Sequence, residues 1–244
     1  MFERSGTSAA ARAGFHRWRF AIVLLASLLL AVGQPLMSGL FDEEGAFDVF
    51  FSLLIIAVLL LVFDQKEHRR FAVGFGLAAF LGVWVGHLLG GPAGRWFLVG
   101  AYLLAAGFFA FALYGILRAI LVKQASGGEI FGAACGYLLL GIIWSLVYCA
   151  VETASVGSFR IPPPGNPDTA VARFDPGALS YFSFITLATV GYGDVTPTTP
   201  LARSLAWLEA ITGQFYLAVL VAGLVGFKVT QAMSNKTIRE ENHD

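Results

Sequence analysis

The sequence predicts an all-α membrane protein with six transmembrane helices and one short re-entrant helix that leads into a loop. Three observations predict this fold class. Hydrophobic residues make up 57% of the 244 residues and charged residues only 13%, whereas a soluble domain has about 25% charged residues. Six apolar runs are close to the length of about 20 residues that a helix needs to cross a bilayer. A seventh apolar segment, residues 177–188, is too short to cross.

The N-terminal part of the chain contains four of the six apolar runs. A polar tail, residues 1–17, precedes the first run at residues 18–37. Cleavage of residues 1–33 as a signal peptide is an open alternative, because a basic start, an apolar core and small residues follow one another there. The next runs are residues 46–63, 71–90 and 96–121. We therefore expect a four-helix N-terminal membrane domain over residues 18–125.

The third and fifth apolar runs contain glycines at four-residue spacing. These are Gly82, Gly86 and Gly90 in the third run, and Gly132 and Gly136 in the fifth. Small residues at this spacing allow membrane helices to approach closely, so we expect them to serve packing rather than gating. His87 lies near the end of the third run. Polar packing and pH sensing are both open for it, because histidine titrates in the physiological range.

The C-terminal membrane domain, predicted at residues 126–233, places the short apolar segment between two long runs. The long runs are residues 130–151 and 200–231. Asp175 before the short segment and Thr199 before the last run are each followed by proline, which is typical of a helix start. A helix over residues 177–188, a non-helical stretch and a long helix together indicate a re-entrant segment. A membrane tolerates such backbone only where protein or water covers it.

The stretch after the short helix consists of Thr189, Val190, Gly191, Tyr192 and Gly193, followed by Asp194. The backbone carbonyls of such a loop, with the Thr189 hydroxyl, can replace the water around a potassium ion. Glycines fit because a strand whose successive carbonyls point the same way needs backbone angles forbidden to residues with a Cβ. These residues match the Thr-Val-Gly-Tyr-Gly selectivity-filter signature, and residues 129–233 resemble the pore domain of the potassium channels.

This resemblance implies a homotetrameric pore, because four such units surround one pore in that family. It also implies a potassium-selective ion channel of the cell membrane, with K⁺ as the passively conducted ion and not as a cofactor. The residues expected to bind K⁺ are Thr189, Val190, Gly191, Tyr192 and Gly193. In the family a pore-helix aromatic holds the carboxylate behind the filter, which implies that Tyr181 supports Asp194 here. The chain departs from the family pattern at Tyr181, where tryptophan is common, and at Ala188, where a second threonine is frequent.

The last apolar run contains the cavity and gating candidates. Gly213 aligns with a glycine at which the family's inner helix often bends, and a hinge role and a packing role are both open. By the same resemblance, the cavity stripe is Gln214, Leu217, Val221 and Val225. Glu209 is expected near mid-membrane, where an acid is costly unless it is hydrogen-bonded or protonated. We expect it to contact Ser183 or Thr186, and a proton-sensing or cavity-charge role is the alternative.

Basic residues near the helix ends predict the orientation. One side has Arg4, Arg12, Arg17, Arg19, Lys66, Arg69, Arg70, Arg118, Lys123, Lys228, Lys236 and Arg239, and the other has Arg95, Arg160, Arg173 and Arg203. This excess predicts a multi-pass protein with both termini in the cytoplasm, including a tail over residues 234–244. The fourth run has no charged residue from Trp96 to Leu117, so we expect no strong voltage gating.

Composition and motifs disfavour other classes of function. A formal net charge of zero and the absence of a basic block give no support to nucleic-acid binding. The expected partners are membrane lipid and the further copies of the chain that the resemblance implies. The sequence has no phosphate-binding glycine loop, nucleophile–base pair or metal-ligand spacing, so we expect neither enzyme activity nor a cofactor. The open alternatives are a non-selective cation channel, a potassium transporter subunit with a channel-like filter, and a regulatory subunit that does not conduct.

Overall fold

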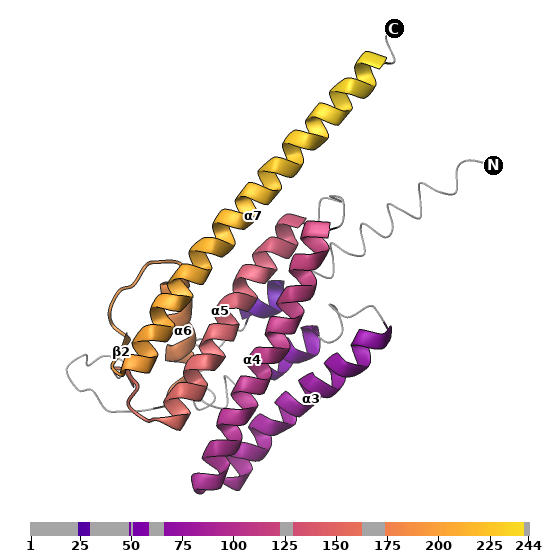
Figure 1. Ribbon diagram of the computed structural model, residues 1–244. Helices are drawn as coiled ribbons and strands as arrows, with labels where there is room; N and C mark the ends of the chain where they lie inside the picture. Colours follow the sequence, from indigo (N-terminus) through magenta and orange to yellow (C-terminus); the bar gives the residue numbers. More distant parts are fainter. Residues whose placement is uncertain are drawn as a thin grey trace.

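A computed structural model describes residues 24–29, 49, 51–58, 66–122, 129–162 and 174–241. Long helices lie side by side over most of this part of the chain (Figure 1). The helices are α3 (Lys66–Leu89), α4 (Gly91–Val122), α5 (Glu129–Ala154), α6 (Pro176–Leu187) and α7 (Pro200–Glu241). Two short strands, β1 (Phe159–Arg160) and β2 (Thr196–Pro197), pair antiparallel. The first two predicted runs fall largely outside the described residues, although 24–29 and 51–58 are helical.

The order of the elements in space follows their order in the chain. Helix α4 packs against α3 on one side and α5 on the other, and α5 also contacts α6 and α7 (Figure 1). Helix α6 touches both α5 and α7, so the shortest helix lies between two long ones. The predicted C-terminal order of long helix, short helix, irregular stretch and long helix is therefore confirmed for the described residues.

Helices α3, α4 and α7 extend furthest beyond their apolar runs, and α4 does so by beginning at Gly91 rather than at residue 96. Helix α3 begins at Lys66 rather than at residue 71, and α7 continues to Glu241 rather than ending near residue 231. Polar residues end a membrane-crossing run but not a helix, and α7 contains no glycine or proline after Gly226 that would stop it. Part of the segment predicted as a cytoplasmic tail is therefore helical.

Glycines determine how closely α3 and α4 approach. Gly90 has φ +60° in the turn between the two helices, and this left-handed conformation costs little energy in glycine because glycine has no Cβ. A Cβ atom at Gly82 would lie 3.0 Å from the Ala101 Cβ, and one at Gly86 would lie 2.6 Å from the Leu98 Cγ. The predicted packing role is confirmed for Gly82 and Gly86, because side chains of α4 occupy the space that these glycines leave, whereas a Cβ at Gly90 would meet nothing within 4 Å.

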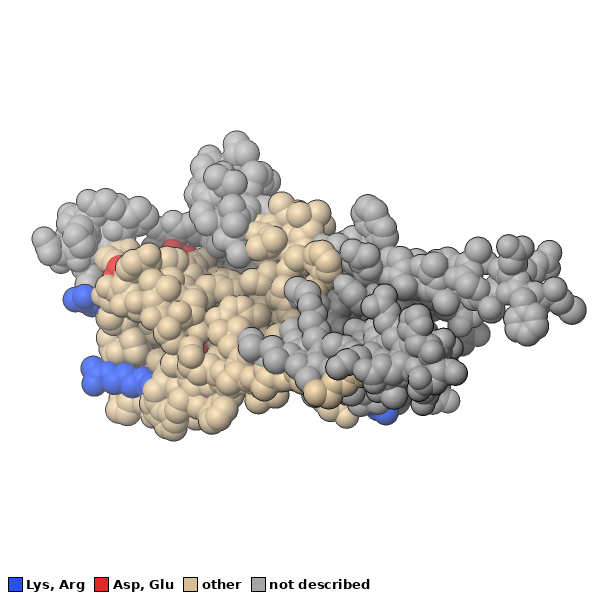
Figure 2. All heavy atoms as spheres, turned by 90° about the horizontal axis from the view of Figure 1, so that it is seen from above, with Lys and Arg blue, Asp and Glu red and all other residues tan. Residues whose placement is uncertain are grey.

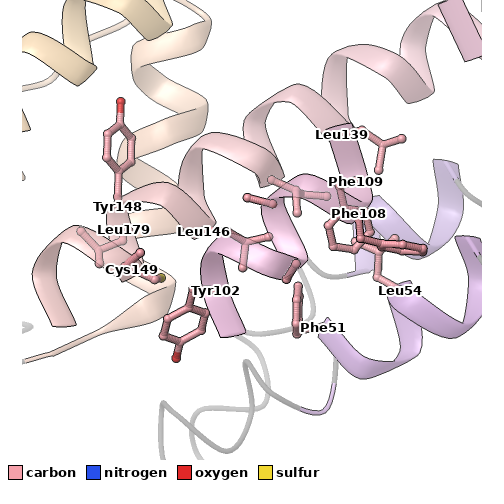
Figure 3. Packing of buried hydrophobic residues seen from close by; sticks show 14 of the residues in the cluster. Phe51, Leu54, Tyr102, Phe108, Phe109, Leu139, Leu146, Tyr148, Cys149 and Leu179 are labelled. Carbon is pink, nitrogen blue, oxygen red and sulfur yellow. The ribbon is translucent and has the colours of Figure 1, made fainter. Parts of the chain in front are cut away.

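The buried core joins the N-terminal and C-terminal helices. Figure 3 shows its large side chains, among them Phe51, Leu54, Phe108, Phe109, Leu139 and Leu146. Nearer to α6, the rings of Tyr148, Phe159 and Phe182 meet edge to face, with centroids 5.2–5.4 Å apart. Aromatic pairs in this arrangement contribute about 0.5–1.5 kcal/mol beyond their buried area. This cluster fixes α5, β1 and α6 to one another.

The outer surface of the described helices is apolar. Within these residues, Gly91–Arg118 of α4 and Phe131–Ala154 of α5 are long and apolar enough to cross a membrane, and Val73–Leu89 is a shorter apolar stretch. Large exposed apolar side chains on α3 and α4 include Leu77, Leu81, Trp84, Trp96, Phe97 and Tyr114. Among the described residues that are visible in Figure 2, Lys, Arg, Asp and Glu are few. An apolar surface of this extent fits contact with lipid.

Candidate functional site

The short helix α6 starts as its sequence predicts. The Asp175 side chain accepts a hydrogen bond from the Ala178 amide at 2.9 Å, and Pro176 occupies the first helical position. Thr199 caps α7 in the same way, with its hydroxyl accepting from the Ala202 amide at 3.3 Å. Both predicted caps are therefore confirmed. They fix the two ends of the irregular stretch that joins α6 to α7.

The irregular stretch has an alternating backbone. Thr189, Gly191 and Gly193 have φ of 58°, 56° and 81°, and the two residues between them do not have positive φ. Thr189 is the one non-glycine residue with positive φ within the described part of the chain. Alternation between left-handed and right-handed residues lets successive peptide groups face the same way. The two glycines thus adopt the backbone angles for which the sequence analysis required them, and Thr189 adopts such an angle in spite of its Cβ.

The same stretch is bonded to the last turn of α6. The Thr189 amide donates to the Thr186 carbonyl at 2.9 Å. The amides of Val190 and Gly191 both donate to the Ile185 carbonyl, at 2.8 and 3.3 Å. The last carbonyls of a helix have no partner within the helix, so these amides fill that deficit. Through these bonds, the position of α6 fixes the position of the residues that follow it. The sequence did not predict them.

Asp194 follows the stretch and is held through both of its carboxylate oxygens. The Tyr181 hydroxyl donates to Oδ2 at 2.8 Å, and the Val195 amide donates to Oδ1 at 3.0 Å. The predicted hydrogen bond from Tyr181 to Asp194 is therefore present, although a tyrosine replaces the usual tryptophan. It connects the first half of α6 to the residue that closes the irregular stretch.

The side chains of the irregular stretch are uncovered in the single chain. All residues from Ala188 to Asp194 are exposed, with Val190 at 48% and Tyr192 at 74% of their full accessible area. Within the described residues, little of the chain therefore covers Val190 and Tyr192. Helix α7 presents an exposed apolar face as well, which includes Trp207, Ile211, Phe215 and Val219.

Glu209 of α7 lies at the junction of three helices and has no exposed surface. Its Oε2 accepts a hydrogen bond from the Tyr148 hydroxyl of α5, and its Oε1 is hydrogen-bonded to the Ser183 hydroxyl of α6. The expected contact with the short helix is confirmed, with Ser183 rather than Thr186 as the partner. Tyr148 was missed, because nothing in an apolar run identifies which tyrosine faces a residue 61 positions later.

Three further bonds fix α5 to α6 and α7. The Tyr137 hydroxyl donates to the Leu187 carbonyl at 3.1 Å, at the end of α6. The Trp144 indole N–H donates to the Thr212 hydroxyl at 3.2 Å. The Tyr216 hydroxyl donates to the backbone carbonyl of α5 at residue 133, at 2.7 Å. Polar side chains in apolar helices thus bond to other helices, as expected for packing in a membrane.

The remaining candidates of α7 and α3 occupy different surroundings. A Cβ at Gly213 would lie 2.8 Å from Leu187 Cδ1 and 2.9 Å from the Leu187 carbonyl oxygen, and α7 is continuous through this position. The structure therefore gives Gly213 a packing role. Gln214 and Leu217 are exposed, while the side chains of Val221 and Val225 fall outside the described residues. His87 is half-buried in the last turn of α3, a helix that packs against α4.

The segments on the two sides of α6 are also clamped together, which sequence reasoning missed. Phe159 of β1 lies opposite Pro197 of β2, and two-residue strands show no periodicity that a sequence could reveal. The buried Glu152 carboxylate accepts from the Gly157 amide at 2.7 Å and from the Phe159 amide at 2.9 Å. The Thr198 amide adds a bond to the backbone carbonyl at residue 158, at 2.8 Å.

Comparison with known proteins agrees with this geometry. Residues 132–229 match a family model described as an ion channel. A two pore potassium channel c of Oryza sativa subsp. japonica is 27% identical over 116 residues, which are 44% of this chain and 25% of that protein. The inward rectifier potassium channel Kirbac3.1 of Paramagnetospirillum magnetotacticum is 33% identical over 99 residues, 39% of this chain and 28% of that protein. Two-pore potassium channel 5 of Arabidopsis thaliana is 36% identical over 47 residues, 19% of this chain and 12% of that protein.

The chain thus spans between 12% and 28% of the length of these three relatives. The matched region runs from α5 through α6 and the irregular stretch into α7, which is the part of the chain that contains Thr189 to Asp194. Residues 132–229 therefore match an ion-channel domain, and this C-terminal part of the chain is similar to potassium channels.

Proposed function

We propose that this chain is one subunit of a potassium-selective channel that conducts K⁺ passively across the cell membrane. The observation that supports this most directly is the alternating backbone of Thr189, Gly191 and Gly193 at the C-terminal end of α6. Carbonyl groups that face one way can replace the hydration shell of K⁺. The carbonyl end of a helix also carries partial negative charge, which favours a cation beside it.

In this proposal four copies of the chain surround one pore. Exposure in the single chain supports such an assembly, because Val190 and Tyr192 leave about half or more of their surface uncovered beside the site. Neighbouring copies would cover these side chains and brace the filter from behind. The exposed apolar face of α7 then lies along the pore and against the neighbouring subunits, with Gln214 and Leu217 on the cavity side.

The proposed topology has six crossings with both termini in the cytoplasm. Its support is the distribution of basic residues along the sequence, together with the apolar surfaces of α3, α4 and α5. In this orientation Asp194 and the β1–β2 pair are on the outer side. Membrane lipid contacts the outer faces of α3 and α4.

We also propose that the channel is not strongly voltage-gated. Helix α4 has Arg95 near its start and Arg118 near its end, with no charged residue between them. One elementary charge that crosses the membrane is worth about 2.3 kcal/mol per 100 mV, so a strong sensor needs several charges in the span. The described α4 lacks them.

The reversal potential of the purified full chain in a planar bilayer tests the proposed function, with K⁺ on one side and Na⁺ on the other. A value near the potassium equilibrium potential, the same after different voltage histories, is the expected result. A value near zero with measurable current would indicate a non-selective cation channel. No current from a correctly assembled tetramer would favour the non-conducting subunit or the transporter subunit.

The matched variants are Thr189→Ala, within the filter, and Thr212→Ala, whose hydroxyl is occupied by Trp144 and by a backbone carbonyl of α7. Thr189→Ala removes a proposed ion-binding hydroxyl and should reduce the preference for K⁺ over Na⁺. Thr212→Ala removes the same hydroxyl and methyl groups at a position outside the filter, and it should leave that preference unchanged. Equal selectivity in the two variants would contradict the role assigned to Thr189.

A further inference from the structure

We infer that Glu209 is a neutral carboxylic acid in the folded protein, and that its proton completes a chain of hydrogen bonds that positions α6. Glu209 has no exposed surface, so it is a positioning residue that acts on the filter through α6. Its effect on ion selectivity rests on the proposed channel function, whereas its protonation does not.

The count of hydrogen atoms requires the acid to be protonated. The Ser183 Oγ is 2.7 Å from the Gly141 carbonyl oxygen and also bonds to Glu209 Oε1, while Tyr148 bonds to Glu209 Oε2. Each of these three contacts between oxygen atoms needs one hydrogen. The serine and tyrosine hydroxyls supply one each, and a carbonyl oxygen supplies none. The third hydrogen must therefore belong to the carboxyl group.

This count also assigns the direction of each bond. Ser183 donates to the Gly141 carbonyl, which can only accept. Glu209 then donates from Oε1 to the Ser183 oxygen and accepts from Tyr148 at Oε2. In this arrangement every contact between two oxygen atoms in the series contains one hydrogen. An ionised carboxylate would leave one contact between two oxygen atoms without a hydrogen.

The surroundings of Glu209 favour the neutral form. The side chains of Glu209, Ser183 and Tyr148 are all fully buried, with 0% relative exposure. Within the described residues, the carboxyl oxygens of Glu209 bond only to hydroxyl groups. The titratable groups that face it from α5 are Tyr148 and Tyr137, and α6 contributes the hydroxyl of Ser183. A buried charge without a charged partner is strongly disfavoured.

Two steps connect this proton to the filter. Ser183 lies two positions before Ile185 on α6, and the Ile185 carbonyl holds the amides of Val190 and Gly191. A shift of α6 would therefore move the carbonyl that fixes the first filter residues. Gly141 allows this helix to lie close to α5, because a Cβ there would come within 2.5 Å of the Phe184 ring.

Infrared spectroscopy of the full chain at neutral pH tests the protonation directly. Wild type should show the carbonyl-stretch band of a protonated carboxylic acid, and Glu209→Gln should lack it. Glu152→Gln is the matched control, because Glu152 is equally buried but accepts from two amides that bring their own hydrogens. That variant should keep the band. If Glu209→Gln instead loses carboxylate bands and the acid band persists, the proposal is overturned.

A second variant keeps the test decisive if Glu209→Gln does not assemble. Ser183→Ala removes the acceptor of the Glu209 proton but not the acid itself. The acid band should therefore remain in Ser183→Ala and move to the frequency of a more weakly bonded group. An unchanged band position would show that Ser183 does not accept this proton.

Reversal potentials test the positioning role. A glutamine at 209 can donate to Ser183 and accept from Tyr148, so it should preserve most of the selectivity. Glu209→Ala and Ser183→Ala each interrupt this series of hydrogen bonds, and the reversal potentials of both variants should move toward zero. A Glu209→Gln variant as unselective as Glu209→Ala would overturn the positioning role. If wild type itself passes no potassium current, the proposed function fails, while the infrared result still decides the protonation.

Discussion

Replacing Tyr148 by phenylalanine removes a single oxygen atom from a fully buried site. The ring keeps its edge-to-face contacts with Phe159 and Phe182, so neither a large cavity nor a clash follows. What is lost is the hydrogen bond to Glu209 Oε2, which leaves a buried acceptor without a donor. The substitution therefore isolates one polar contact between α5 and α7.

The size of the effect depends on the protonation of Glu209. A buried unsatisfied group costs about 1–3 kcal/mol, whereas hydrogen bonds between membrane helices average about 0.6 kcal/mol. We expect Tyr148→Phe to lower the stability by about 1 kcal/mol per subunit, which is about 4 kcal/mol for a tetramer that unfolds as a unit. A hydrogen bond to an ionised carboxylate is roughly twice as strong, so its loss would cost about twice as much.

The assay is the reversible unfolding of the assembled protein in mixed micelles, followed by the fraction of the proposed tetramer. Tyr114→Phe is the matched control, because Tyr114 is 60% exposed on α4. The control should unfold like wild type. If Tyr148→Phe is as stable as Tyr114→Phe, then the hydrogen bond contributes nothing and the reasoning from the structure is refuted.

Three more substitutions test the site. Gly191→Ala places a Cβ at φ 56°, which costs roughly 1–2 kcal/mol, and should shift the reversal potential in a K⁺/Na⁺ gradient toward zero; an unchanged potential would argue against a strained filter. Gly213→Ala places a Cβ 2.9 Å from the Leu187 carbonyl oxygen and should destabilise the tetramer by about 1–3 kcal/mol on a denaturant titration, whereas wild-type stability would argue against close packing. Tyr181→Phe removes the donor to Asp194 and should make current decay faster during sustained conduction, and an identical time course would show that the bond does not support the filter.

The sequence was most informative where chemistry allows few residue types. Proline after Asp175 and after Thr199 predicted the starts of α6 and α7, because proline is tolerated in the first turn of a helix and a short polar side chain caps it. The glycines at 191 and 193 predicted their own positive φ for a similar reason. The acid at 209 predicted a buried partner, since an apolar environment leaves few alternatives.

Features that depend on which faces meet were not predictable. Tyr148 is one of several tyrosines in apolar helices, and only the packing of α5 against α7 selects it as the partner of Glu209. The bonds from Val190 and Gly191 to Ile185 depend on the local turn geometry after α6, which many sequences can adopt. The observed ends of α3 and α7 differ from the predicted ends for another reason. An apolar run indicates the thickness of the membrane, whereas these helices continue through polar residues beyond it.

The clamp between β1 and β2 has a consequence for the length of the chain between them. One end of the segment that precedes α6 is fixed at Arg160, which lies opposite Thr196, and the other end is fixed by the Asp175 cap. The entropy of closing a loop grows only logarithmically, about 0.6 kcal/mol for each doubling of its length. Extra residues inserted between these two anchors would therefore cost little free energy of loop closure and leave residues 189–193 in place. The segment is a suitable position for an inserted epitope or fluorophore tag.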